Sequence, residues 1–188
     1  VTTLLFNLAL LRYVGEDGVA ALTIVMYVLM LAGALHSGYA YGVAPMISYY
    51  YGEQNHPKLK KLINSSTCII ACVSIFTLLF SLLMTEPLVS IFTSPDNPVY
   101  DLAVTGNRIC SFALLFVGFN IFGSAMFTAI SNGLVSAVLA FSRSFVFLII
   151  TMLVFPAIWG VNGIWLATPV AEAMAFCLTM FMAARYKK

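Results

Sequence analysis

An acidic residue stands in the middle of an apolar segment near the C-terminal end of the sequence. Glu172 lies about halfway along this segment, in TPVAEAMAF, three residues after Pro169. If the segment crosses a membrane, a charge there costs about 2.5–3.5 kcal/mol and normally faces other helices or a water-filled cavity. Glu172 could carry a proton or a cation, or bind a cationic substrate. It could equally be a structural carboxylate bonded to a neighbouring helix, and Pro169 should free a backbone carbonyl beside it.

Two basic side chains occupy similar surroundings. Arg143 lies several residues inside its apolar segment, where its stem could snorkel to the surface or its guanidinium could pair with Glu172. We interpret Arg143 as a structural charge partner. His36 lies in AGALHSGYAYG with Tyr39 on the same helix face, and histidine could relay protons near neutral pH. A neutral ring hydrogen-bonded between helices is the alternative, so Glu172 and His36 are the candidates for ion coupling.

Polar and aromatic side chains also share the segment VGFNIFGSAMFTAISNG. Asn120 and Ser124 lie one helical turn apart, and Phe127 follows on the next turn. Amides and hydroxyls beside aromatic rings suit a cavity for flat, apolar cations. Hydrogen bonds between helices are the alternative. Asn7, in the first apolar segment, is interpreted in the same two ways.

No sequence pattern supports enzyme catalysis, nucleic-acid binding or metal binding. The motifs G-x-S-x-G, H-E-x-x-H and the P-loop are absent, and no two carboxylates stand at a working spacing, so we predict no enzyme and no catalytic residue. The basic residues are scattered rather than gathered on one face, which argues against nucleic acid. We also predict no cofactor and no metal site, because the cysteines lie in apolar runs without a histidine cluster: Cys68, Cys72, Cys110 and Cys177.

The composition predicts a membrane protein built from helices. Hydrophobic residues make up 62 % of the chain, charged residues 9 %, and the mean hydropathy is +1.00. A spanning helix needs roughly 20 apolar residues. The first apolar run covers about half a membrane, so we expect it to be part of a helix cut by the start of the chain, and the chain to be part of a longer protein. The predicted helices are about 1–11 (partial), 19–48, 62–84, 102–130, 134–158 and 160–183.

Turns, small residues and charges complete the predicted bundle. Gly38 and Gly42 form a small-xxx-small pair that favours close approach of another helix. Positive charge is enriched on the cytoplasmic side of membrane proteins. Four helices separate the two basic regions of this chain, so both should face the cytoplasm, with the acidic joint 86–101 outside. The basic residues are Lys58, Lys60 and Lys61 in one region, and Arg185, Lys187 and Lys188 in the other.

The order of several short motifs resembles the multidrug and toxic compound extrusion (MATE) transporters, and within them the MepA/DinF-like branch. One element, G-x-x-x-x-A-A, runs from Gly15 to Ala21 and opens a helix that closes at Gly52-Glu53. Further similar stretches are PLVSIFT, FTAISNG, Arg143 and FPAIWGVNGIWLATPVAE. The resemblance covers essentially the whole chain. It implies an all-α, polytopic membrane bundle: the C-terminal six-helix lobe of a MATE-type transporter, with its first helix truncated.

The resemblance also implies a function. MATE transporters export cationic, amphipathic compounds from the cell by alternating access, in antiport with Na⁺ or H⁺ as the coupling ion. We therefore expect multidrug efflux in the plasma membrane, with the missing N-terminal lobe as partner and the lipid bilayer as surroundings. The expected wall of the cleft between the lobes contains Asn7, His36, Tyr39, Asn120, Ser124 and Phe127.

Two departures from the family keep other interpretations open. The NorM-type branch places acids before this chain begins and near Asn120, and the chain has no acid at that second place. Three candidates for coupling therefore stay open: an acid of the missing lobe, Glu172 and His36. One alternative function is a lipid-linked oligosaccharide or polysaccharide flippase of the same superfamily, which should need a cationic groove. The other is a membrane scaffold module without transport activity.

Overall fold

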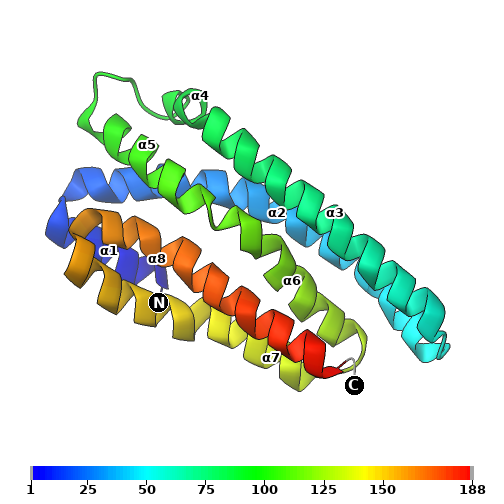
Figure 1. Cartoon of the computed structure of the whole chain (residues 1–188). Coiled ribbons are helices and arrows are strands. Elements are labelled where there is room, and N and C mark those ends of the chain that lie inside the picture. The colour runs from blue at the N-terminus through cyan, green and yellow to red at the C-terminus, as the bar shows by residue number, and fades with distance from the viewer. Residues whose placement is uncertain (1, 187–188) are drawn as a thin grey trace.

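Long helices packed side by side form the whole of the described chain (Figure 1). The computed structural model describes residues 2–186, which contain no strand, and Lys187 and Lys188 of the second basic region lie outside them. This confirms the predicted all-α bundle of apolar helices. Its elements are α1 (Thr2–Tyr13), α2 (Glu16–Gly52), α3 (His56–Leu83), α4 (Thr85–Ser90), α5 (Pro98–Ser111), α6 (Leu114–Ala129), α7 (Gly133–Phe141), the π-helical turn η1 (Ser142–Phe147) and α8 (Leu148–Tyr186).

Asparagine caps begin three of these helices. The Asn55 side chain accepts a hydrogen bond from the Lys58 amide at the start of α3, at 3.3 Å. Asn97 does the same for α5 through Val99, at 2.9 Å. Both of these caps are followed by a proline in the first turn of the helix, and the third cap, Asn132, begins α7 without one. Such caps satisfy amides that have no partner inside the helix, so the Asn- and Pro-rich joints set where the helices start.

The predicted helix over 102–130 is not one straight helix. It breaks after Ser111, and α5 and α6 meet at an angle of 52°. The Ser111 hydroxyl donates to the carbonyl of Asn107 at 2.6 Å, one turn back, a bond that often bends helices. The next amides, of Phe112 and Ala113, form tight bonds three residues back. Neither proline nor glycine stands at the break, so no residue type marks it in the sequence.

The C-terminal stretch reverses direction at Gly160. This residue has φ 57° and ψ −132°, and Figure 1 shows the ribbon turning back on itself there. An ion pair of 2.8 Å between Arg143 and Glu172 requires the reversal. In one straight helix these residues would lie about 44 Å apart at 1.5 Å per residue. The segment labelled α8 therefore consists of two antiparallel arms.

The helices are long and apolar enough for several membrane passes. By length and composition, α2, α3 and the continuous stretch Gly133–Tyr186 qualify, and the bent pair α5–α6 qualifies as a fourth span. Because the last stretch turns back at Gly160, it supplies two passes rather than one. Large apolar side chains such as Leu31, Phe76 and Leu153 remain exposed along the bundle, as expected for a surface that faces lipid.

Close helix approach occurs at glycines other than the predicted pair. A methyl group added at Gly38 or Gly42 would meet no atom within 4 Å, so no helix of this lobe packs against that face. The prediction of close approach there was wrong for the described part of the chain. Gly106 lies instead against the ring of Trp165, and Gly118 lies against the ring of His36.

Candidate functional site

Four side chains from α6, η1 and α8 form one hydrogen-bonded group, here called the Glu172 network: Asn120, Arg143, Glu172 and Thr179. Arg143 Nε donates to both carboxylate oxygens of Glu172, at 2.8 and 3.0 Å. Asn120 Nδ2 donates to Glu172 Oε2 at 2.7 Å and to its backbone oxygen at 3.0 Å. Thr179 Oγ1 donates to Asn120 Oδ1 at 3.2 Å. Of the two arrangements considered for Arg143, the structure has the ion pair with Glu172.

The network explains how a membrane helix can carry this carboxylate. The side chains of Arg143 and Glu172 are only 27 % and 13 % exposed. Either charge alone would cost about 2.5–3.5 kcal/mol near the middle of a bilayer. Pairing the two charges and adding the Asn120 amide gives both carboxylate oxygens a donor, which offsets much of this cost.

Two irregularities of the backbone shape the surroundings of the network. Arg143 belongs to the π-helical turn η1, and π turns inside α-helices occur frequently at functional sites. On the facing arm, Pro169 has no amide to bond the Trp165 carbonyl, and Cys110 Sγ donates to that oxygen at 3.4 Å. The predicted free carbonyl thus exists and bonds a neighbouring helix. The π turn was not foreseen, since SRSFVF contains no residue typical of one.

A polar cavity of about 310 Å³ lies beside the network, between α2, α6, the α7–η1 helix and α8. It contains two of the predicted residues, Asn120 and Ser124, together with Arg143. Arg143 is the one charged side chain in this lining, whereas Glu172 lies behind it. The full lining is Ser37, Tyr41, Asn120, Ile121, Ser124, Ala125, Thr128, Leu139, Ala140, Arg143, Ser144, Ala175 and Thr179.

Hydroxyl groups cross-link the helices next to this cavity. The Ser124 and Ser136 hydroxyls lie 2.9 Å apart, and Thr128 Oγ1 donates to Ser136 Oγ at 2.8 Å. These bonds tie α6 to α7. Ser124 therefore bonds a neighbouring helix, as the alternative interpretation has it, and also lines a cavity. Ser136 was missed in the sequence, where a single serine in an apolar run carries no signal.

His36 does not line a cleft. This α2 side chain is 2 % exposed and packs against α3 and α6. Its Nδ1 lies 2.9 Å from the Ala32 carbonyl, which can only accept, so Nδ1 carries a proton. Its Nε2 lies 3.2 Å from the Ser74 hydroxyl, which donates to it in the neutral ring. The structure supports the alternative of a hydrogen-bonded histidine packed between helices. A side chain in the wall of a cleft would be more exposed than this ring.

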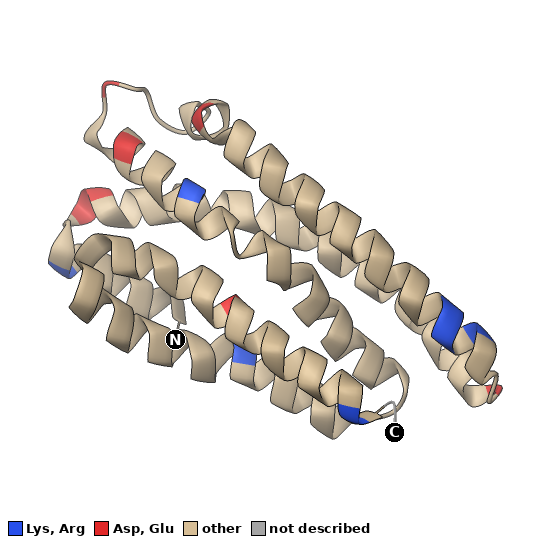
Figure 2. Ribbon diagram, in the orientation of Figure 1, with Lys and Arg blue, Asp and Glu red and all other residues tan. Residues whose placement is uncertain are grey.

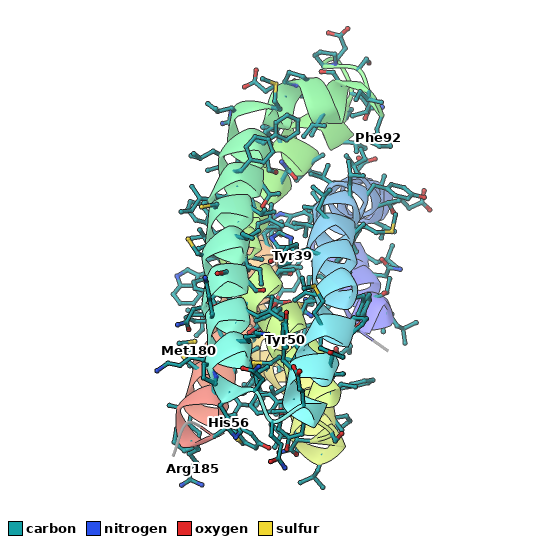
Figure 3. All side chains as sticks on the ribbon, turned by 90° about the vertical axis from the view of Figure 1, so that its right-hand side faces the viewer. Tyr39, Tyr50, His56, Phe92, Met180 and Arg185 are labelled. Atoms are coloured by element: carbon teal, nitrogen blue, oxygen red, sulfur yellow. The ribbon has the colours of Figure 1, made fainter. Side chains whose placement is uncertain are left out.

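The other expected wall residues are also placed inside the lobe. Phe127 is completely buried and meets the ring of Tyr186 edge to face, with 5.7 Å between ring centroids. Tyr39 extends between α2 and α3 (Figure 3), where its hydroxyl donates to Ser66 Oγ at 3.2 Å. Asn7 is half-buried in α1 and lines neither of the cavities described here. The Phe127 ring thus packs into the core of this lobe.

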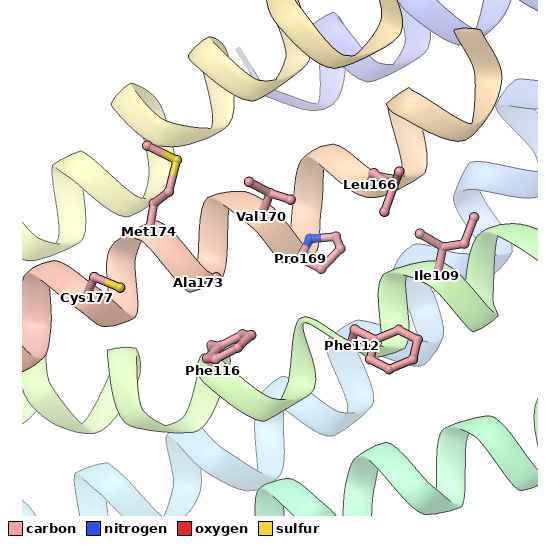
Figure 4. A pocket seen from close by; sticks show the side chains of 9 residues that line it. All are labelled: Ile109, Phe112, Phe116, Leu166, Pro169, Val170, Ala173, Met174 and Cys177. Carbon is pink, nitrogen blue, oxygen red and sulfur yellow. The ribbon is translucent and has the colours of Figure 1, made fainter. Parts of the chain in front are cut away.

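A second cavity, of about 410 Å³, is apolar. It lies where the α5–α6 bend meets the last arm of α8, with Phe112 and Phe116 on one side and Pro169 on the other (Figure 4). It offers carbon and sulfur atoms but no charged group, so it can hold an apolar chain and cannot orient a polar ligand. Its lining is Ile109, Phe112, Phe116, Leu166, Pro169, Val170, Ala173, Met174 and Cys177.

Comparison with known families decides the class of the protein. The sequence model of the MatE family matches residues 1–154. The chain belongs to the MatE family. It is a family of membrane transporters, and the MATE-type lobe predicted from the sequence is the fold observed. No curated protein sequence matches this MatE chain significantly.

Solved MATE transporters share the fold of this MatE chain. An outward-facing multidrug resistance MATE transporter of the MOP superfamily matches with a TM-score of 0.88 and 22 % identity, over 100 % of this chain and 43 % of its own. An inward-facing multidrug resistance MATE transporter matches with a TM-score of 0.92 and 21 % identity, over 98 % of this chain and 43 % of its own. A mutant of the Vibrio cholerae transporter VcmN matches with a TM-score of 0.90 and 16 % identity, over 100 % of this chain and 43 % of its own. This chain therefore spans less than half the length of these structures.

Proposed function

We propose that the complete protein is a secondary active exporter of cationic, amphipathic compounds, driven by antiport with Na⁺ or H⁺. The observation that carries the proposal is the match of the described bundle to one lobe of MATE transporters, over essentially its whole length. In this proposal a second, N-terminal lobe supplies the other wall of the transport cleft.

Alternating access would move this lobe as a rigid body. One lobe fold is similar to both the outward-facing and the inward-facing transporter, with TM-scores of 0.88 and 0.92. The bonds that tie α6 to α7 and α8, through Ser124 and Asn120, favour a lobe that rotates as a unit. The substrate would then be exposed to each side of the membrane in turn.

Glu172 is the coupling candidate that we carry forward. It is the one carboxylate in the middle of a spanning segment of this sequence. A proton on Glu172 would remove the charge that holds Arg143 and would loosen the contact between η1 and α8. His36 is a weaker candidate because its ring is enclosed by Ala32, Ser74 and Gly118.

The proposal is tested with the full-length protein in liposomes. Efflux of a cationic fluorescent dye is measured with an inward Na⁺ gradient, with an inward proton gradient, and with neither. One of the gradients should accelerate efflux at least tenfold, and Glu172→Gln should remove most of that acceleration. Glu86→Gln is the matched control, because Glu86 forms an exposed ion pair with Arg108 at the bundle surface. Efflux that ignores both gradients would contradict the antiport.

We also propose that the C-terminal end of the bundle faces the cytoplasm. Figure 2 shows most of the basic residues at the end where α2 meets α3 and α8 finishes, and most of the acidic residues at the opposite end. Figure 3 likewise places His56 and Arg185 at one end. The expected result is that an impermeant maleimide labels Ser94→Cys but not Asn55→Cys in intact cells, in a variant without the native cysteines. The reverse labelling would invert the proposed orientation.

A further inference from the structure

The guanidinium of Arg143 has donors that the Glu172 network does not use. Arginine carries five N–H donors. The bonds to Glu172 come from Nε alone, and within residues 2–186 neither Nη atom donates to a protein group. The side chain is nevertheless 27 % exposed and lines the polar cavity. The two Nη groups of Arg143 are therefore available on the cavity side.

The charge that the cavity presents is positive. Glu172 is absent from its lining, and its carboxylate already accepts from Arg143 and Asn120. The remaining polar lining consists of neutral amide and hydroxyl groups, among them Ser37 and Ser144, whose hydroxyls form no hydrogen bond within residues 2–186. Each of these hydroxyls can donate a hydrogen bond. The cavity thus combines a cation with several donors, and this combination binds an anionic oxygen group.

We propose that this cavity binds the carboxylate of a transported compound, held by the two Nη groups of Arg143. The planar edge of a guanidinium matches a carboxylate through two parallel hydrogen bonds. The fixed geometry of Arg143 supports this: Glu172 holds Nε, so the Nη edge is oriented in advance. At about 310 Å³ the cavity suits one polar end of a ligand rather than a whole drug-sized molecule.

The site narrows the substrate class, and this step rests on the proposed function. A purely cationic compound offers no acceptor to the Nη groups of Arg143 and gains nothing from the cavity. A compound that carries a carboxylate besides its cationic centre would place the carboxylate in the cavity and its cationic, apolar body outside. Tyr41 lines the cavity and is 67 % exposed, so its ring can cover such a body. The preferred substrates are therefore amphipathic zwitterions.

Direct binding tests the site without relying on transport. The full-length protein, purified in dodecyl maltoside, is titrated with a rhodamine dye that has a free carboxyl group and with the methyl ester of the same dye. Fluorescence polarisation should show at least tenfold tighter binding of the acid. Arg143→Gln should remove that preference, and Arg143→Lys should keep part of it, because an ammonium retains the charge but not the fork.

Matched controls keep the result interpretable. Arg108→Gln removes an exposed arginine outside the cavity and should leave the preference unchanged. Arg143→Lys can still pair with Glu172, so it remains informative if Arg143→Gln does not fold. Equal binding of acid and ester by the unaltered protein would overturn the proposal. So would a loss of preference on adding phosphatidylglycerol, since a lipid headgroup would then be the occupant.

A transport measurement separates the two proposals. If the acid binds selectively but neither dye is exported from liposomes, the carboxylate site stands and the proposed function fails. If both dyes are exported at the same rate and bind equally, the exporter stands and the carboxylate site fails. Selective binding together with faster export of the acid supports both.

Discussion

The ion pair of Arg143 and Glu172 joins the two arms of the C-terminal hairpin. Removing one partner leaves the other charge in an apolar environment without its counter-ion, which costs about 3–5 kcal/mol when the site is buried. We expect Arg143→Gln and Glu172→Gln each to lower the free energy of unfolding by about 3 kcal/mol. The double variant should lose less than the sum, by about 1–3 kcal/mol, because it leaves no unpaired charge. Unfolding in mixed micelles measures all three, and strict additivity would contradict the coupling.

Gly118 shows why a single missing side chain matters. A glycine changed to alanine inside a helix normally stabilises it by about 1 kcal/mol. At Gly118 the new methyl group would meet the His36 ring and come within 2.9 Å of Ile70 Cγ2. We expect Gly118→Ala to destabilise the protein by about 1–3 kcal/mol through overpacking. Gly42→Ala is the control, since its methyl group meets nothing within 4 Å, and thermal unfolding of both variants decides the matter.

Residue types predicted some members of the site but not the contacts between them. Asn120, Arg143 and Glu172 could be selected from the sequence because charge and amide groups are costly inside an apolar helix. Their mutual contacts depend on the hairpin and on the π turn η1, which no residue of SRSFVF announces. His36 shows the opposite outcome: the family resemblance implied a place in the cleft wall, and packing against Gly118 buries the ring.

At the scale of elements, the reversal at Gly160 positions the network. With φ 57° and ψ −132°, this residue adopts a backbone conformation that a side chain disfavours strongly. We expect Gly160→Ala to destabilise the protein by about 1–3 kcal/mol and to weaken the contact of Arg143 with Glu172. Gly133→Ala, at the first residue of α7 and with open space around it, should be nearly neutral. A thermal midpoint that is the same for both variants would show that Gly160 tolerates a side chain.

The helix boundaries followed local signals, and the bends only partly did. Asn55 and Asn97 cap the starts of α3 and α5, since caps act through residues next to them. The predicted ranges began later, at 62 and 102, because hydropathy marks only the apolar part of each helix. Gly160 likewise marked the division between the last two predicted helices. The 52° bend between α5 and α6 had no such marker. It arises where Ser111 bonds the Asn107 carbonyl and the Ser81 hydroxyl, and this depends on α3 being in place.

At the scale of the molecule, the proposed transport path needs more than this bundle. Its polar cavity is bounded by helices of this lobe, yet the chain spans less than half the length of the transporters it matches. Alternating access requires a second body against which the lobe can move. We therefore expect residues 1–188 alone, reconstituted in liposomes, to show no ion-driven dye transport, while the full-length protein transports. Circular dichroism must first show that the isolated lobe keeps its helices, because an unfolded lobe would be inactive for another reason. Dye-stimulated ion flux through the folded lobe would mean that two copies can build both walls, and the proposed dependence on an N-terminal lobe would then be wrong.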